Sequence, residues 1–128
     1  MEGDGGTLRL LGWLALVVAV VLQVAGLYSQ GTPQPGGVPG LDKVAHLVAF
    51  AVPAALARLL GVRWVLVALV AHALVSEPLQ HQVAPHRQLD ALDTVADLVG
   101  IGAGWLFGGA LVSRSRARPV ARSRDGRS

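Results

Sequence analysis

The chain has 128 residues, of which 52% are hydrophobic and 15% are charged, and its formal net charge is +3. This balance is more apolar than that of ordinary soluble domains, so it argues against a soluble globular protein and for a membrane protein. The sequence contains no cysteine, which excludes disulfides, thiolate nucleophiles and cysteine metal sites. The positive charge is concentrated in residues 114–128, which carry six arginines and Asp125, whereas residues 1–113 have a net charge of −2.

The first predicted element is a helix over residues 8–27, a 20-residue run with one arginine near its start and one glutamine near its end. Such a run is long enough to cross a bilayer core of about 30 Å. A cleaved signal peptide is the competing interpretation, because the run ends near small residues. Glu2 and Asp4 oppose the charge of Arg9, which makes a poor positive leader, so a spanning helix is favoured.

A loop and two helices follow. Residues 28–41 hold four glycines and three prolines, which support neither a helix nor a strand. The next apolar run predicts a helix over 44–60, with Asp42 near its start and Gly61 as its C-cap. A third helix is predicted over 62–79. Because only the turn at Gly61 separates these two helices, they must be antiparallel neighbours.

The last apolar run predicts a helix over 94–112, in which Asp97 is the only charged residue. Asp90 or Asp93 is its expected N-cap. The remaining segment, residues 113–128, has no apolar periodicity and is expected to be a disordered basic tail. No aromatic residue interleaves its arginines, so nucleic acid is not an expected partner.

The predicted fold class is an all-α membrane protein with four transmembrane helices in residues 1–112. Its orientation follows from the positive-inside rule, because lysine and arginine near short loops are retained in the cytoplasm. With both termini cytoplasmic, nine arginines lie on the cytoplasmic side and only Lys43 and Arg87 lie outside. The sequence therefore predicts a multi-pass protein whose two termini are cytoplasmic and whose tail lies near anionic lipid.

Polar residues gather at the end of the predicted helices that is the outer end in this topology. Helical spacing places Asp42 and His46, four residues apart, on one face, and Glu77 and Gln80, three apart, on another. Ionisable side chains at such positions are functional candidates by default. The predicted binding residues are Asp42, Lys43, His46, Glu77, Gln80, Arg87, Asp90, Asp93 and Asp97.

The last predicted helix carries its acids and glycines in one stripe. Asp97 lies roughly 6 Å deeper than Asp93 along the helix, too deep for an unpaired carboxylate that faces lipid. We therefore expect Asp97 to pair with His46 or Arg87, or to be protonated. The glycines of the stripe, Gly100, Gly104 and Gly108, form a small-residue pattern that lets another helix approach closely.

These residues also form a recognisable pattern. It comprises Asp42, Lys43, His46 and Phe50, then Glu77 and Gln80, then Arg87 and Asp93, with Gly100 and Gly104 following. The pattern resembles the VanZ-like family, small bacterial membrane proteins named for a member linked to teicoplanin resistance. The resemblance covers about residues 8–112 and implies an envelope protein of the bacterial cytoplasmic membrane. Asp97 is a departure, because the family usually has an asparagine there; to donate a hydrogen bond as an amide does, Asp97 must be protonated.

The sequence is compatible with three functions. The first is a non-enzymatic protein that binds a lipid-linked or cell-wall-related group, or a glycopeptide, with Lys43 and Arg87 contacting an anion. The second is a membrane-embedded enzyme acting on an envelope lipid or precursor, with His46 as general base and Glu77 or Asp93 as acid. The third is a small transporter or channel, which requires an oligomer because four helices leave little room for a gated path.

A purely structural interpretation competes with all three, since a polar network can simply pin helix ends together. Helix capping explains Asp42 and Asp93 but explains neither His46 nor Glu77. A metal site formed by His46, Glu77, His81, His86 and an aspartate is disfavoured, because their spacing would place His81 and His86 on different faces of a helix and Pro85 breaks any helix there. No nucleotide-binding or nucleophile motif is present, so no cofactor is expected.

Overall fold

The computed structural model describes residues 3–29, 38–83 and 90–117, and it is all-helical within these ranges. The helices are α1 (Gly3–Tyr28), α2 (Leu41–Leu60), α3 (Arg63–Val83) and α4 (Ala91–Arg116). The predicted all-α class is therefore confirmed. Within the described residues, three segments are long and apolar enough to cross a membrane, namely Asp4–Tyr28, Leu41–Leu60 and Ala91–Arg116.

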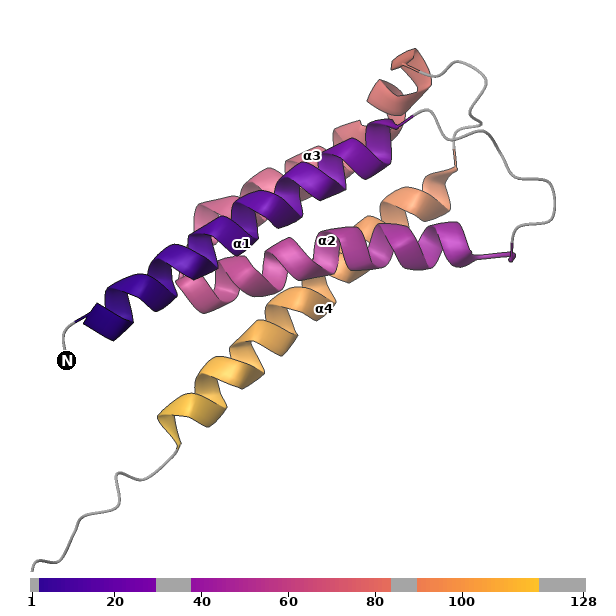
Figure 1. Cartoon of the computed structure of the whole chain (residues 1–128). Coiled ribbons are helices and arrows are strands. Elements are labelled where there is room, and N and C mark those ends of the chain that lie inside the picture. Colours follow the sequence, from indigo (N-terminus) through magenta and orange to yellow (C-terminus); the bar gives the residue numbers. More distant parts are fainter. Residues whose placement is uncertain (1–2, 30–37, 84–89, 118–128) are drawn as a thin grey trace, which may run out of the picture.

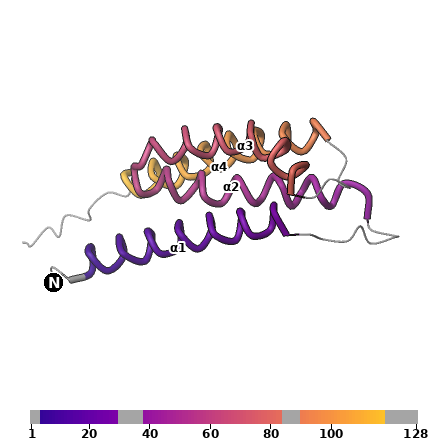
Figure 2. Tube along the Cα trace, turned by 90° about the horizontal axis from the view of Figure 1, so that it is seen from above, coloured from indigo at the N-terminus to yellow at the C-terminus, as the bar shows by residue number. Residues whose placement is uncertain are grey.

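The helix outside this set, α3, carries a polar end. Its last seven residues include Glu77, Gln80, His81 and Gln82, which lower its hydropathy. Pro78 lies inside the helix, where it removes a helical hydrogen bond. Figure 2 shows the final turns of α3 leaving the line of the rest of the helix, as expected near a proline. The helix nevertheless continues to Val83, beyond the predicted end at residue 79.

The helix α4 is also longer than predicted. Asp90 is its N-cap, and the Asp90 carboxylate accepts a hydrogen bond from the Leu92 backbone N–H at 3.0 Å. At the other end the helix continues to Arg116, so residues 113–116 of the expected disordered tail are helical. Arginines in a last turn interact favourably with the negative end of the helix dipole. Residues 118–128 of that tail lie outside the described residues.

The helices α2 and α4 form the most extensive contact and cross each other in Figure 1, whereas α1 packs mainly against α2. Gly61 connects α2 to α3 with a φ of 73°, a left-handed conformation that suits glycine, and its N–H caps the end of α2. The start of α1, the α2–α3 turn and the end of α4 all lie toward one end of the bundle (Figure 1). Basic side chains gather there: Arg9, Arg58, Arg63, Arg114 and Arg116.

A line of glycines explains how closely α2 and α4 approach. The glycine seam consists of Gly100, Gly104 and Gly108 on α4, which are buried. A Cβ added to Gly104 would collide with the Ala51 carbonyl of α2, and one added to Gly100 would collide with the Leu47 carbonyl. The small-residue pattern therefore serves the contact with α2, and no larger residue fits the seam without separating the two helices.

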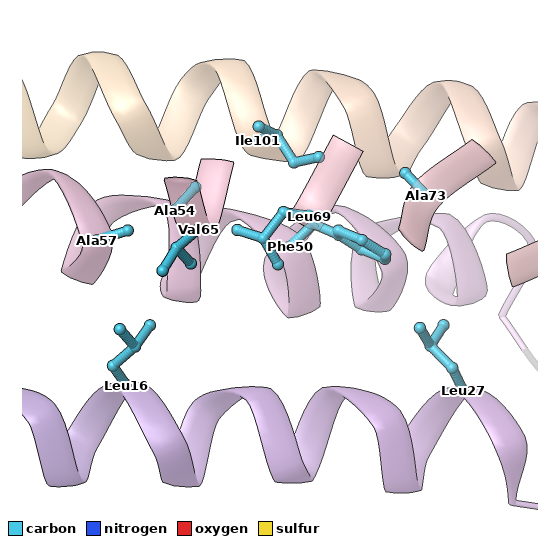
Figure 3. Close-up of a cluster of buried hydrophobic side chains, with 9 residues drawn as sticks. All are labelled: Leu16, Leu27, Phe50, Ala54, Ala57, Val65, Leu69, Ala73 and Ile101. Carbon is cyan, nitrogen blue, oxygen red and sulfur yellow. The ribbon is translucent and has the colours of Figure 1, made fainter. Parts of the chain in front are cut away.

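The apolar core lies among all four helices (Figure 3). Phe50, Ala54 and Ala57 from α2 are fully buried at its centre. Buried alanines on α2 and α3 allow these two helices to lie near each other, and Leu16 and Leu27 cover the side of the core that faces α1. The buried set comprises Leu16, Leu27, Phe50, Ala54, Ala57, Val65, Leu69, Ala73 and Ile101.

Candidate functional site

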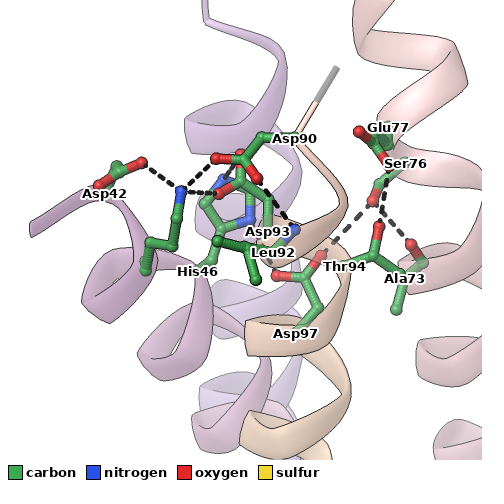
Figure 4. A network of polar contacts seen from close by, with 11 residues as sticks. Asp42, His46, Ala73, Ser76, Glu77, Asp90, Leu92, Asp93, Thr94 and Asp97 are labelled. Carbon is green, nitrogen blue, oxygen red and sulfur yellow. Dashed lines mark hydrogen bonds and ion pairs between the residues drawn. The ribbon is translucent and has the colours of Figure 1, made fainter. Parts of the chain in front are cut away.

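Lys43 is the centre of a group of three carboxylates at the polar end of the bundle. Its ammonium donates to Asp42 Oδ2 at 2.9 Å, to Asp90 Oδ2 at 2.6 Å and to Asp93 Oδ1 at 2.9 Å (Figure 4). Asp42 precedes Lys43 on α2, whereas Asp93 lies in the first turn of α4 and Asp90 caps it. The three carboxylates lie within 4.8 Å of one another, a spacing compatible with a metal ion, but the Lys43 ammonium is already bonded to each of them.

His46 lies deeper, between two carboxylates of α4. Its Nδ1 is 2.9 Å from Asp97 Oδ1, and its Nε2 is 3.6 Å from Asp93 Oδ2. The exposed fraction is 5% for His46 and 0% for Asp97, so this pair is shielded from solvent. Only the protonated imidazolium can donate from both ring nitrogens. A protonated His46 would therefore form a hydrogen bond with Asp97 and an ion pair with Asp93 at a distance too long for a hydrogen bond.

The helix α3 adds two contacts to the site. The Ser76 hydroxyl lies 3.5 Å from Asp97 Oδ2 and donates to the Ala73 carbonyl at 3.0 Å. The Thr94 hydroxyl donates to Glu77 Oε2 at 3.3 Å, which joins α3 to the first turns of α4 (Figure 4). Sequence reasoning did not select Ser76 or Thr94. Each is a hydroxyl residue directly next to a selected acid in the sequence, and this position is the feature that could have identified it.

These contacts define the polar network, which joins α2, α3 and α4 near one end of the bundle. Its members are Asp42, Lys43, His46, Ser76, Asp90, Asp93 and Asp97, with Glu77 and Thr94 paired beside it. Of the two residues expected to pair with Asp97, the structure places His46 beside it. Gln80 is buried on α3 and its Nε2 has no hydrogen-bond partner. Arg87 lies outside the described residues.

Negative charge dominates the network. The carboxylates of Asp42, Asp90, Asp93 and Asp97 face one lysine and one histidine. The Lys43 ammonium, followed by the Leu92 N–H, holds the pKa of Asp90 below its usual value. An anion that bound Lys43 would have to displace one of these carboxylates, so the geometry disfavours the anion contact expected of Lys43.

A cavity of about 250 Å³ lies beside the network, between α1 and α2. Asp42 and His46 border it from α2, and Gln23 borders it from α1. Sequence reasoning gave Gln23 no role at the site; its signal was a lone amide in an otherwise apolar helix, a feature that marks a packed face. The other described residues that line the cavity are Leu22, Gly26, Leu27, Ala45 and Ala49.

His72 lies in the middle of α3, outside the polar network. Its Nε2 is 3.2 Å from the Tyr28 hydroxyl, and the two rings stack with centroids 5.9 Å apart. Phe50 covers it at 5.6 Å between ring centroids. These contacts join α1, α2 and α3 in the core.

Comparison of the chain with protein-family models, with curated proteins and with solved structures finds no match.

Proposed function

We propose that this chain is a VanZ-like integral membrane protein of the bacterial cytoplasmic membrane and that it binds a lipid-linked or cell-wall-related group through its polar network. In this proposal all four helices cross the membrane, both termini are cytoplasmic, and the network faces the outer side. The segregation of charge supports this orientation, because Arg9, Arg58 and Arg63 lie toward the end of the bundle opposite to the network.

The observation that carries the proposal is the buried His46–Asp97 pair beside a cavity. An ionisable residue inside a membrane helix costs roughly 2.5–3.5 kcal/mol on insertion scales. Buried ion pairs are often replaceable by apolar residues without loss of stability, so stability alone is a weak reason to keep one. A cavity bordered by His46 and Asp42 supports a role in binding for the pair.

A membrane-embedded acid/base enzyme is the second candidate, and the position of His46 favours it. A histidine whose two ring nitrogens face Asp93 and Asp97 can accept a proton on one side while a carboxylate stabilises the imidazolium. Such an enzyme would act on an envelope lipid or precursor that enters beside Asp42.

The orientation is tested by single-cysteine labelling at Gly37 and Ser123 in the otherwise cysteine-free chain. An impermeant maleimide added to intact cells is expected to label position 37 and to leave position 123 unlabelled until the cells are lysed. The reverse pattern would place the polar network on the cytoplasmic side and contradict the proposal.

The function is tested by mass spectrometry of lipid extracts from a strain that lacks the protein, together with its teicoplanin sensitivity. Altered sensitivity with an unchanged lipid composition is expected for the binding protein. An accumulated precursor would favour the enzyme instead. If neither property changed, and if restoring the gene had no effect, the role in the envelope would be wrong.

A further inference from the structure

The cavity between α1 and α2 contains a feature that the polar network does not use. Gln23 borders it and is only 3% exposed, and neither its amide nitrogen nor its amide oxygen has a hydrogen-bond partner in the part of the chain that the structure describes. An unpaired donor and acceptor in an apolar interior are costly, and buried polar groups in proteins are nearly always bonded. Gln23 therefore offers a donor and an acceptor that this fold leaves unmatched.

The walls of the cavity restrict what can match them. Leu22, Leu27, Ala45 and Ala49 provide apolar surface, and the ionisable residues of the described lining are Asp42 and His46. Beside the cavity, the Lys43 ammonium is already bonded to three carboxylates. Among the described residues, a phosphate or carboxylate in the cavity would therefore meet the negative charge of Asp42 while Lys43 is engaged by the acids and His46 by Asp97, whereas a neutral group that donates a hydrogen bond would be attracted.

We infer that the cavity binds the amide-bearing part of an amphiphile. A primary amide has an N–H on the same side as its C=O, and the two can pair with the amide oxygen and the amide nitrogen of Gln23 through two hydrogen bonds. The apolar chain lies against the leucines and alanines of α1 and α2, and a further donor on the ligand reaches Asp42. Both amide atoms of Gln23 are covered by protein in this structure, so its side chain turns toward the ligand on binding.

The inference rests on the proposed function, because Asp42 and His46 belong to both the cavity and the polar network. It adds the chemical class of the ligand, an amide-bearing amphiphile in place of an anion.

The test uses the full chain in lipid nanodiscs, labelled with ¹⁵N at glutamine side chains, with octanamide and octyl phosphate as probes. The Gln23 amide signal is identified by its loss in Gln23→Leu. Gln80 is a matched internal control, because it is also buried with an unpartnered amide nitrogen but does not border the cavity. We expect octanamide to shift the Gln23 signal saturably and to leave the Gln80 signal in place, and octyl phosphate to shift neither.

A second measurement compares variants. Gln23→Leu is expected to bind octanamide about tenfold more weakly, since two hydrogen bonds are lost, while Gln82→Leu, at an exposed position of α3 that does not border the cavity, binds as the wild type does. Partition of octanamide into the bilayer is common to all variants, so the difference between them reports on Gln23. Thermal unfolding checks the fold, and Gln23→Leu is expected to melt at a higher temperature without ligand, because it removes the unpaired amide.

Three results would overturn the inference: no shift at Gln23 with octanamide, a shift at Gln23 with octyl phosphate, or equal affinity in wild type and Gln23→Leu. None of them bears on the lipid composition or teicoplanin sensitivity of the deletion strain. Conversely, an unaffected deletion strain would sink the proposed function even if octanamide bound at Gln23, so the two failures are distinguishable.

Discussion

The two halves of the α2–α4 contact are held together in opposite ways. In the polar half, Lys43 and His46 of α2 reach across to the acids of α4 through charged side chains. In the other half, the glycine seam lets the α4 backbone lie directly on the α2 backbone at Gly100 and Gly104. Long side chains can adjust to a substitution, but two touching backbones cannot. We therefore expect the glycine seam to govern assembly and the polar half to govern what the protein does.

Gly104→Leu is the strongest way to break the seam. The new side chain would collide with the Ala51 backbone, so α2 and α4 must separate, and we expect a loss of more than about 3 kcal/mol in stability. Gly102→Leu is the matched control, because no atom lies within 4 Å of a Cβ at that position. Thermal unfolding in detergent measures both variants. Equal melting temperatures for the two would show that the close approach at Gly104 is not required.

Asp97 is the point where the two halves meet, and two substitutions there separate charge from shape. Asp97→Lys places a second cation beside His46 in a fully buried position, and we expect it to cost about 3 kcal/mol or more. Asp97→Asn keeps the shape and an acceptor for His46, and it supplies the residue usual in the VanZ-like family; we expect it to cost about 1 kcal/mol or less. If the asparagine variant lost as much stability as the lysine variant, the carboxylate would have to be ionised and specifically paired. Exchanging the charges of His46 and Asp97 would then identify the partner.

Asp90 gives the smallest effect, and it depends on pH. Lys43 and the Leu92 N–H lower its pKa in the folded protein, while the unfolded value is about 3.9. The stabilising contribution of the carboxylate is therefore complete above about pH 4 and is lost as the pH falls through the lower, folded value. Asp90→Asn retains a good N-cap. The difference in melting temperature between wild type and Asp90→Asn should be constant from about pH 5 to 7 and shrink below about pH 4. A difference that grew on acidification would contradict the contact with Lys43.

Much of the fold could be predicted because each helix coincides with an apolar run. The ends of the helices could not be predicted, because residues that flank an apolar run are compatible with both helix and loop. Arg114 and Arg116 continue α4, where they interact favourably with the negative end of its dipole, and Pro78 does not end α3. At the site, spacing predicted which residues share a face of α4, including Asp97 above the glycines. Spacing cannot identify partners on other helices, so the three acids around Lys43 and the contact of Ser76 with Asp97 required the structure. The position of Gln23 at the cavity could not be predicted for the same reason. An amide in an apolar run indicates a packed helix face, but it does not show which residues or cavity the side chain contacts.

Native mass spectrometry of the purified protein tests most directly whether the polar half binds a ligand while the glycine seam maintains the fold. Wild type and His46→Gln are released from lipid nanodiscs under identical conditions, and the molecules that remain attached are identified. We predict that His46→Gln melts within a few degrees of wild type but has lost a bound lipid-linked species that wild type retains, because His46 borders the cavity while the glycine seam is intact. If both proteins carried the same molecules in the same amounts, the polar half would be a structural contact between helix ends and not a binding site.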